Sequence, residues 1–305
     1  MKILITGGSG MVGRSLKQLL PEAIYPTSTE LDLTDGLAVK DYMFRGKFDS
    51  VIHLAAHVGS LHDNIENSTL YFDRNILMNT LLTKYAYESG VKHFLGILSS
   101  CIYPDDIKEF PIPESSLHIG APHSDLMSYS YAKRSHAVQL DAYRNSFSVN
   151  YNYLIPCNLY GEKQESHKGR SHFINDLIYK ICIAKLNGER KITLFGDGTP
   201  LRQFMHSEDF AKVIFSYISK KINTSFNVAP KLNMSIDEMA RTALDACGCG
   251  SFTISYDSSK PNGQHRKDVN TSLMQKYLPD IEFRSLRDGM SSLFQTEYQS
   301  LRVVK

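Results

Sequence analysis

The first thirteen residues constrain the fold of this chain more than any other segment does. The apolar run Ile3–Thr6 leads directly into a turn that contains Gly8, Gly10 and Gly13, and a helical pattern follows. Glycine at this spacing allows a tight turn between a strand and a helix, and it lets the backbone approach a pyrophosphate. The first N–H groups of the helix would face that anion. The segment therefore predicts a dinucleotide-binding unit, and the alternative is a glycine-rich turn without a ligand.

Strand and helix patterns alternate through the first half of the chain. Strands are expected at residues 3–6, 23–25, 50–55, 93–100 and 150–156, and helices at residues 11–20, 39–44, 67–90 and 131–147. This alternation is typical of an α/β protein with a doubly wound parallel sheet, the Rossmann class of fold. We therefore expect a Rossmann domain over residues 1–160, with a return segment near 203–225, and a smaller C-terminal substrate-binding domain over residues 161–305.

The pattern is looser beyond Gly161. A polar stretch covers residues 162–170, helices are expected at 173–186 and 234–246, and a short strand at 192–195. Ser235 stands three residues before Glu238, which predicts a capping box at the start of the last of these helices.

Unusual residues gather where the predicted strands end. In a doubly wound sheet, ligands bind beyond the carboxyl ends of the strands. The sequence therefore predicts ligand contacts at the junctions 6–13, 55–59, 99–104 and 156–161. Asn75 and Asn79 share one face of a predicted helix, where they would either hold the backbone of the site or cap a turn.

Tyr129 and Lys133 stand four residues apart, which places them on one face of a helix. A lysine ammonium near a phenol is expected to lower the pKa of that phenol. The phenol could then exchange a proton with a carbonyl or alcohol oxygen, and Ser99 or Ser100 could hydrogen-bond the same oxygen. A tyrosine and a lysine at this spacing also occur by chance on ordinary amphipathic helices.

The composition excludes several classes of function. The 305 residues carry a net charge of +2, so the chain has no broad basic field for nucleic acid or an anionic membrane. No apolar run reaches the length of a bilayer span, and the N-terminus lacks a secretory signal pattern. The five cysteines are odd in number and lack paired spacing. We therefore expect a cytoplasmic protein without a disulfide framework or a bound metal.

Several motifs together resemble those of a known family. They occupy residues 7–13, 54–59, 99–104, 129–133, 158–161, 171–172 and 196–206. In this order they resemble the extended short-chain dehydrogenases/reductases, and more narrowly the GDP-L-fucose synthase family of GDP-4-keto-6-deoxymannose epimerase/reductases. The run Ser99-Ser100-Cys101-Ile102-Tyr103-Pro104 is the most specific of these motifs.

The resemblance implies roles for five residues in catalysis. Tyr129 would donate the proton, Lys133 would support it and contact the ribose, and Ser99 would be a second donor to the substrate oxygen. Cys101 and His172 would form the acid/base pair for epimerisation. By sequence position alone, Cys101 could instead be a small packed residue and His172 a solvated histidine.

The resemblance also implies a binding site for NADPH and one for a GDP-sugar. The expected cofactor contacts are Gly7, Gly10, Met11, Val12, Gly13, Asp32, Leu33, Ala55, Ala56, Tyr129, Lys133, Pro156, Asn158, Leu159 and His172. The expected substrate contacts are Asn158, Lys180 and Arg202. The family usually has arginine where Lys180 stands, and lysine loses the bidentate phosphate geometry.

The segment after residues 23–25 indicates which dinucleotide is preferred. NAD-binding folds normally place an acidic residue at the end of the second strand, but here no acidic residue occurs before Glu30. That absence permits a 2′-phosphate, which Ser9, Arg14 or Thr27 could contact. The sequence therefore favours NADP.

The expected function is NADPH-dependent C4 reduction of a GDP-4-keto sugar, a 6-deoxyhexose or a heptose, with or without 3,5-epimerisation. The resemblance also implies a homodimer formed through two helices of each subunit. Two alternatives stay open at this point. One is a nucleotide-diphosphate-sugar 4-epimerase with tightly bound NAD, and the other is a non-catalytic nucleotide-sensing protein.

Overall fold

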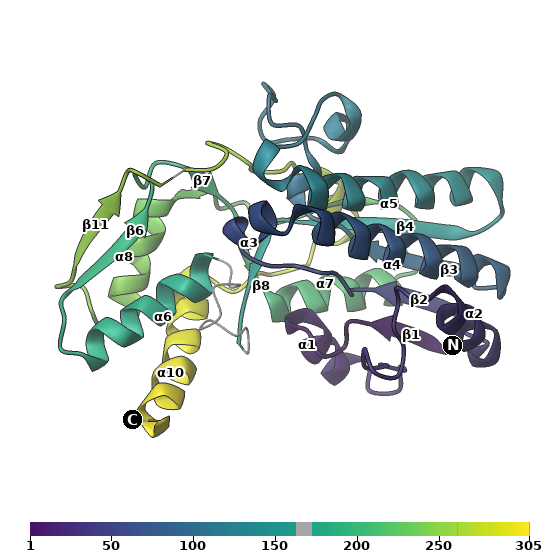
Figure 1. The fold of residues 1–305 in the computed structure, drawn as a ribbon, viewed down its shortest axis with the longest axis horizontal. Coiled ribbons are helices and arrows are strands. Elements are labelled where there is room, and N and C mark those ends of the chain that lie inside the picture. Colours follow the sequence, from purple (N-terminus) through teal and green to yellow (C-terminus); the bar gives the residue numbers. More distant parts are fainter. Residues whose placement is uncertain (163–172, 261, 305) are drawn as a thin grey trace.

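Five parallel strands form the central sheet of the computed structural model, which describes residues 1–162, 173–260 and 262–304 (Figure 1). In spatial order they are β1 (Ile3–Thr6), β2 (Ser50–His53), β3 (His93–Ile97), β4 (Asn150–Pro156) and β9 (Phe226–Val228). The strand expected at 23–25 is reduced to one bridge between Ile24 and Leu4, on the far side of β1. The chain therefore moves from β1 to one side and then returns to the other side, which makes the carboxyl end of β1 a topological switch point.

Helices cover both faces of this sheet. Right-handed crossovers in opposite directions put α1 (Met11–Leu19) and α4 (Ser68–Glu88) on opposite faces. α7 (Ser207–Ser219) packs against α1, whereas α2 (Gly36–Gly46) and α5 (Met127–Ser146) pack against α4 (Figure 1). The predicted doubly wound α/β fold is confirmed.

A second group of elements lies away from the N-terminal end of the sheet (Figure 1). It contains α6 (Phe173–Leu186), β6 (Lys191–Phe195), α8 (Ile236–Ala246), β11 (Thr253–Asp257) and α10 (Leu286–Val304). Short elements complete the described chain: α3 (Leu61–Glu66), α9 (Ser272–Tyr277), β5 (Asn158–Tyr160), β7 (Leu201–Arg202), β8 (Phe204–His206), β10 (Met234–Ser235), and the 3-10 helices η1 (Ser100–Ile102), η2 (Glu114–His118) and η3 (Ser124–Leu126).

Two separate clusters of buried apolar side chains stabilise these groups. The larger cluster surrounds the central sheet and includes Leu4, Ile52 and Leu154. The smaller cluster joins α6, α8 and α10 through residues such as Ile178 and Met239. Burial of apolar area is the main favourable term in folding, so each cluster stabilises its own group of elements.

Local sequence signals place most element boundaries correctly. The strand 150–156 and the helix 173–186 occur as expected, and the capping box of Ser235 and Glu238 is present at the start of α8. The helix expected at 131–147 begins earlier, at Met127, because η3 leads directly into it. Tyr129 therefore lies in the first turn of α5.

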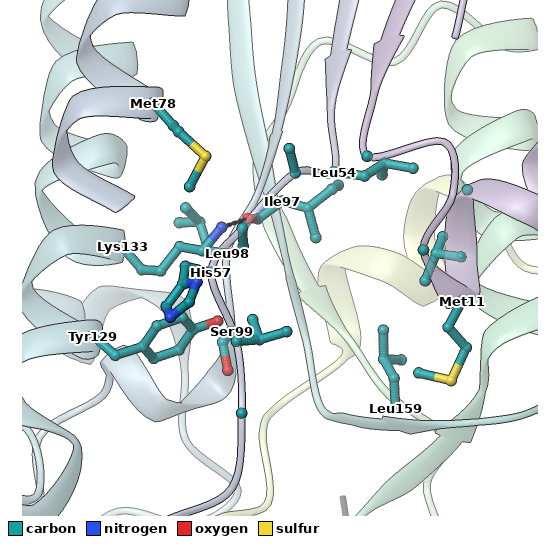
Figure 2. Close-up of a pocket in the computed structure, with 18 of the residues that line it drawn as sticks. Met11, Leu54, His57, Met78, Ile97, Leu98, Ser99, Tyr129, Lys133 and Leu159 are labelled. Atoms are coloured by element: carbon teal, nitrogen blue, oxygen red, sulfur yellow. Dashed lines mark hydrogen bonds between the residues drawn. The ribbon is translucent and has the colours of Figure 1, made fainter. Parts of the chain in front are cut away.

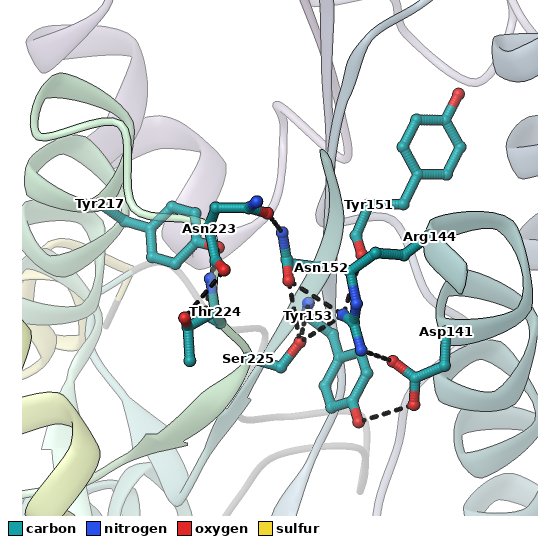
Figure 3. Close-up of polar contacts among 9 residues, drawn as sticks. All are labelled: Asp141, Arg144, Tyr151, Asn152, Tyr153, Tyr217, Asn223, Thr224 and Ser225. Atoms are coloured by element: carbon teal, nitrogen blue, oxygen red, sulfur yellow. Dashed lines mark hydrogen bonds and ion pairs between the residues drawn. The ribbon is translucent and has the colours of Figure 1, made fainter. Parts of the chain in front are cut away.

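A polar network fastens α5 to β4 at the end of the sheet where β4 begins (Figure 3). The Arg144 guanidinium donates to the Tyr151 carbonyl at 3.1 Å and to Asn152 Oδ1 at 3.0 Å, and it also pairs with Asp141. Asn152 is buried, and its amide donates to Asn223 Oδ1 at 2.6 Å. These contacts satisfy polar groups that would otherwise be buried without partners.

We expect Arg144→Met to lower the free energy of unfolding by about 2 kcal/mol, because it removes the guanidinium that donates to the Tyr151 carbonyl and to Asn152 Oδ1 and that pairs with Asp141. Urea denaturation measures this loss. Arg45→Met is the control, since the Arg45–Asp41 pair has side chains that are 81% and 56% exposed and should contribute little. Equal losses in the two variants would contradict the role of the network.

Candidate active site

A cavity of about 740 Å³ lies at the carboxyl ends of β1 to β4. Residues from all four predicted junctions line it, because parallel strands bring their carboxyl ends to the same edge of a sheet. Every described residue that we expected to contact the cofactor is among the lining residues. His172 lies outside the described residues.

The turn after β1 depends on glycine. Gly7 has a φ of +75°, and its carbonyl accepts a hydrogen bond from the Gly10 amide at 3.0 Å. A Cβ atom on Gly13 would lie 2.4 Å from the Gly7 carbonyl oxygen, which is too close. α1 begins after Gly10 with no side-chain cap, so the amides of its first turn have no acceptor within the helix. This arrangement fits the pyrophosphate of a dinucleotide.

Asn75 of α4 holds the loop that follows β2. Its side chain accepts from the His57 amide at 3.0 Å and donates to the His57 carbonyl at 2.9 Å. Asn79, one turn further on, contacts His53 Nε2 at 3.0 Å, and His53 Nδ1 contacts Thr6 Oγ1 at 2.7 Å. Burial lowers the pKa of His53 to about 3, so this histidine is neutral and structural. The two asparagines therefore hold the backbone of the site.

Ser99, Tyr129 and Lys133 come together at the wall of the cavity (Figure 2). β3 ends just before Ser99, and α5 presents Tyr129 and Lys133 from adjacent turns. Lys133 is buried, and its ammonium donates to the Ile97 carbonyl at 2.9 Å. Burial lowers the pKa of Lys133 to about 8.

The pKa of Tyr129 differs from the sequence-based expectation. Burial raises it above the ordinary value of a phenol, and negative charge on Cys101 raises it further, although the hydrogen bond with Ser99 lowers it. The prediction that Lys133 lowers this pKa is therefore wrong for the protein without ligand, because burial dominates and the ammonium binds the Ile97 carbonyl. Tyr129 is a protonated phenol at neutral pH, which suits a proton donor.

Cys101 lies in η1, two residues after Ser99, and it lines the cavity. It is partly exposed, whereas the other four cysteines are buried. Its backbone amide donates to Ser99 Oγ at 3.3 Å. The Lys267 ammonium lies 3.2 Å from its sulfur. Sequence reasoning missed Lys267, because no local motif marks it and 166 positions separate the two residues.

The predicted substrate residues occupy different positions around the cavity. Asn158 lines it, and its side-chain amide donates to the Gln203 carbonyl at 3.0 Å. Arg202 does not line it; its guanidinium donates to the Leu201 carbonyl at 2.8 Å, and its charge helps to lower the pKa of Cys101.

Lys180 lies outside the cavity lining and pairs with Asp176 at 2.9 Å. Its ammonium is 5.0 Å from the centre of the Phe195 ring, and the ammonium of Lys260 is 5.9 Å from the same ring. Phe195 is 63% exposed. The sequence analysis missed this exposed aromatic ring with its two cations. The available signal was Phe195 itself, an apolar residue at an exposed position of a strand in which buried apolar and exposed polar residues otherwise alternate.

The end of the cavity near Ile24 contains two groups that we expected at a 2′-phosphate, Ser9 and Thr27. Arg14 is not among the lining residues, whereas Arg74 of α4 is. The Thr27 hydroxyl and amide both donate to Glu30, at 2.9 and 2.7 Å. Arg74 is a cation of this part of the cavity, because its charge helps to lower the pKa of Asp32, which lines the cavity close to Thr27 in the chain.

A separate cluster of Glu162, His206 and Glu208 has ligand-type atoms within 4.8 Å of one another. His206 Nδ1 accepts from the Glu208 amide at 3.3 Å and so caps α7, which leaves the proton on Nε2, 3.4 Å from Glu162. Glu208 pairs with Arg284. Both carboxylates of this cluster thus have protein partners, whereas His206 Nε2 has only the 3.4 Å contact with Glu162.

A Rossmann sheet, a glycine turn and a Ser–Tyr–Lys set define a dinucleotide-dependent enzyme fold of the short-chain dehydrogenase/reductase class. The chain belongs to the NAD dependent epimerase/dehydratase family, whose model matches residues 3–229. No helix in the described part of the chain is long and apolar enough to cross a membrane.

Relatives with assigned names support this placement and confirm the predicted resemblance. The probable GDP-L-fucose synthase of Drosophila melanogaster is 32% identical over 95% of both chains. The GDP-L-colitose synthase of Yersinia pseudotuberculosis is 34% identical over 91% of this chain and 92% of its own. The crystal structure of a GDP-L-fucose synthetase from Naegleria fowleri bound to NADP has a TM-score of 0.87, with 28% identity, and covers 98% of this chain and 93% of its own.

We expect Gly13→Ala to weaken the binding of NADPH at least about tenfold, or about 1.4 kcal/mol, because the added methyl group would collide with the Gly7 carbonyl. Calorimetric titration measures the affinity. Gly36→Ala is the matched control, since its Cβ would meet only the flexible Leu81 side chain at 3.3 Å. Unchanged binding in Gly13→Ala would contradict the pyrophosphate assignment.

Proposed function

We propose that this protein reduces the C4 ketone of a GDP-4-keto sugar, a 6-deoxyhexose or a heptose, with NADPH, and that it also epimerises the sugar at C3 and C5. The observation that carries the proposal is the convergence of Ser99, Tyr129 and Cys101 on one wall of the cavity. The named relatives support the substrate class, since they include GDP-L-fucose and GDP-L-colitose synthases.

The reduction requires a proton donor at the C4 oxygen. A nicotinamide bound in the cavity would supply the hydride to C4. Tyr129 is protonated because burial raises its pKa, so it can donate its proton to the developing alkoxide. Ser99 would hydrogen-bond the same oxygen, and the Lys133 ammonium would add positive charge beside it.

Epimerisation uses the same oxygen. A ketone at C4 makes the protons on C3 and C5 acidic, because the carbanion becomes an enolate whose charge rests on the C4 oxygen. Ser99 and Tyr129 would stabilise that charge. Cys101 would take the proton from carbon. His172, outside the described residues, stays the predicted group that returns a proton to the opposite face.

The cofactor proposal rests on two features besides the glycine turn. The segment that follows Ile24 brings no carboxylate before Glu30, and Arg74 lines the same part of the cavity. A cation there would favour a 2′-phosphate. The NADP-bound structure from Naegleria fowleri also supports NADP.

We infer that residues 161–305 mainly bind the GDP part of the substrate. Phe195, with Lys180 and Lys260 against its ring, offers a stacking surface for a base and positive charge for a diphosphate. Arg202 is a further cation near the cavity, because its charge lowers the pKa of the Cys101 thiol. Since lysine binds phosphate as a point charge, Lys180 would contribute attraction without bidentate geometry.

We also propose a homodimer formed through α4 and α5. These helices pack together and expose apolar side chains, among them Leu77 and Val138, which are 44% and 54% exposed. Exposed apolar side chains on adjacent helices suit contact with a second copy. We also propose a cytoplasmic location, which the five free cysteines support.

Purified protein tests the reduction directly. With GDP-4-keto-6-deoxymannose, we expect one NADPH to be consumed per sugar. The absorbance of the reduced nicotinamide measures this consumption. Tyr129→Phe should lower the rate at least about a hundredfold, because it removes the proton donor. Tyr131→Phe is the control, since Tyr131 is partly exposed and packs on Arg134. Sugar interconversion without consumption of added NADPH would instead identify a 4-epimerase.

The pH dependence of the reduction should follow Lys133. Its ammonium is charged below a pKa of about 8 and loses its charge as the pH rises through that value, while Tyr129 stays protonated. We therefore expect kcat/KM to fall about tenfold per pH unit above this pKa. In Lys133→Arg the fall should move to higher pH, because a guanidinium stays charged. An identical alkaline limb in both proteins would show that Lys133 does not set it.

A further inference from the structure

Lys267 is fixed at the edge of the cavity by its neighbours in the chain. It lies between β11 and α9, in a segment that forms a bridge to Leu201 at Arg266 and a bridge to Ile112 at Val269. The Val269 amide also donates to Gln203 Oε1 at 2.9 Å. These bridges on both sides hold the backbone of Lys267 beside the active-site wall.

The ammonium of Lys267 is buried without a carboxylate. Its residue is 9% exposed, and the described residues provide no carboxylate within ion-pair distance of it. The adjacent Asp268 is already held by Arg266, with distances of 2.6 and 3.0 Å. A buried cation requires an anion or several hydrogen bonds to offset its lost hydration. The group that it contacts is the Cys101 sulfur, at 3.2 Å.

From this geometry we propose that Lys267 forms an ion pair with Cys101 and holds it as the thiolate that acts as the carbon base. Lys267 is then a positioning residue, and its role in turnover rests on the function proposed above. In the step, the thiolate takes a proton from C3 or C5, an S–H bond forms and the C–H bond breaks. The electron pair moves to the C4 oxygen as the enolate, and Lys267 keeps its protons.

The charged groups around Cys101 favour this assignment. Burial by itself would raise the pKa of the thiol, but Lys267, the Ser99 hydroxyl and Arg202 together bring it below its ordinary value. Cys157 is also within the field of Lys267, yet burial raises the pKa of that thiol. Tyr129 also faces Cys101, and negative charge on Cys101 raises the pKa of the Tyr129 phenol. The ion pair therefore ionises Cys101 and helps to keep Tyr129 protonated.

Alkylation of the free enzyme tests the ion pair without any sugar. The rate of reaction of Cys101 with iodoacetamide is followed against pH, with the modified residue identified by peptide mass, in wild type, Lys267→Gln and Lys267→Arg. We expect the midpoint to rise by about one pH unit or more in Lys267→Gln, which keeps a hydrogen-bond donor but no charge. Lys267→Arg should restore it. Cys101→Ser reports any background from the buried cysteines. An unchanged midpoint in Lys267→Gln overturns the proposal.

Deuterium exchange tests the consequence for the proposed function. In deuterated water without NADPH, wild type should place deuterium at C3 or C5 of the GDP-4-keto sugar. Lys267→Gln should lower kcat for this exchange about tenfold or more with little change in KM, and raising the pH should recover part of the loss. A rise in KM alone would mean that Lys267 only binds phosphate, and would overturn the proposal. A shifted alkylation midpoint with no exchange in wild type would instead refute the proposed epimerisation while the ion pair stands.

Discussion

The parallel direction of the five strands is the constraint on which the site depends. Because every strand points the same way, the segments after β1, β2, β3 and β4 all open at one edge, and the cavity lies there. Buried side chains then fix these segments. Asn75 holds the loop after β2 through two backbone hydrogen bonds, and Gly7 and Gly13 let the first turn close without a side chain in the way. A rigid scaffold of this kind holds the side chains of a site within about 0.5 Å of their working positions.

Cations dominate the electrostatics of the site. Lys133, Arg202 and Lys267 are held against carbonyl oxygens or sulfur, and no carboxylate within ion-pair distance neutralises any of them among the described residues. Their charge thus remains available to groups that become negative, such as an enolate, an alkoxide or a thiolate. The same field acts in opposite directions on two neighbouring groups. Lys267 and Arg202 lower the pKa of the Cys101 thiol, whereas burial and negative charge on Cys101 raise the pKa of the Tyr129 phenol.

Site residues that belong to short sequence motifs were predictable from the sequence. The glycine turn, the Tyr129–Lys133 spacing and the Ser99–Cys101 run each lie within a few positions, and the parallel fold brings their segments together. Lys267 was not predictable, because its partner is remote in the chain and no adjacent motif marks it. Phe195 carried a local signal, an apolar residue at an exposed position of an alternating strand, but that signal does not reveal its two lysine partners. The raised pKa of Tyr129 was also missed, since the spacing indicates that Lys133 is near but not how far the surrounding protein desolvates the phenol. The strand expected at 23–25 is only a single bridge between Ile24 and Leu4.

The two halves of the Cys101–Lys267 pair come from parts of the chain that are 166 positions apart. Cys101 lies within residues 3–229, which match the family, whereas Lys267 lies beyond them. If Cys101 is the carbon base as proposed, a single substitution at Lys267 would leave Ser99, Tyr129 and Lys133 unchanged and make that base weaker. Divergence between enzymes that invert a sugar before reducing it and enzymes that only reduce it therefore does not need to begin at the catalytic cysteine. In this architecture it can begin at the buried lysine of a remote segment that lies against the cysteine.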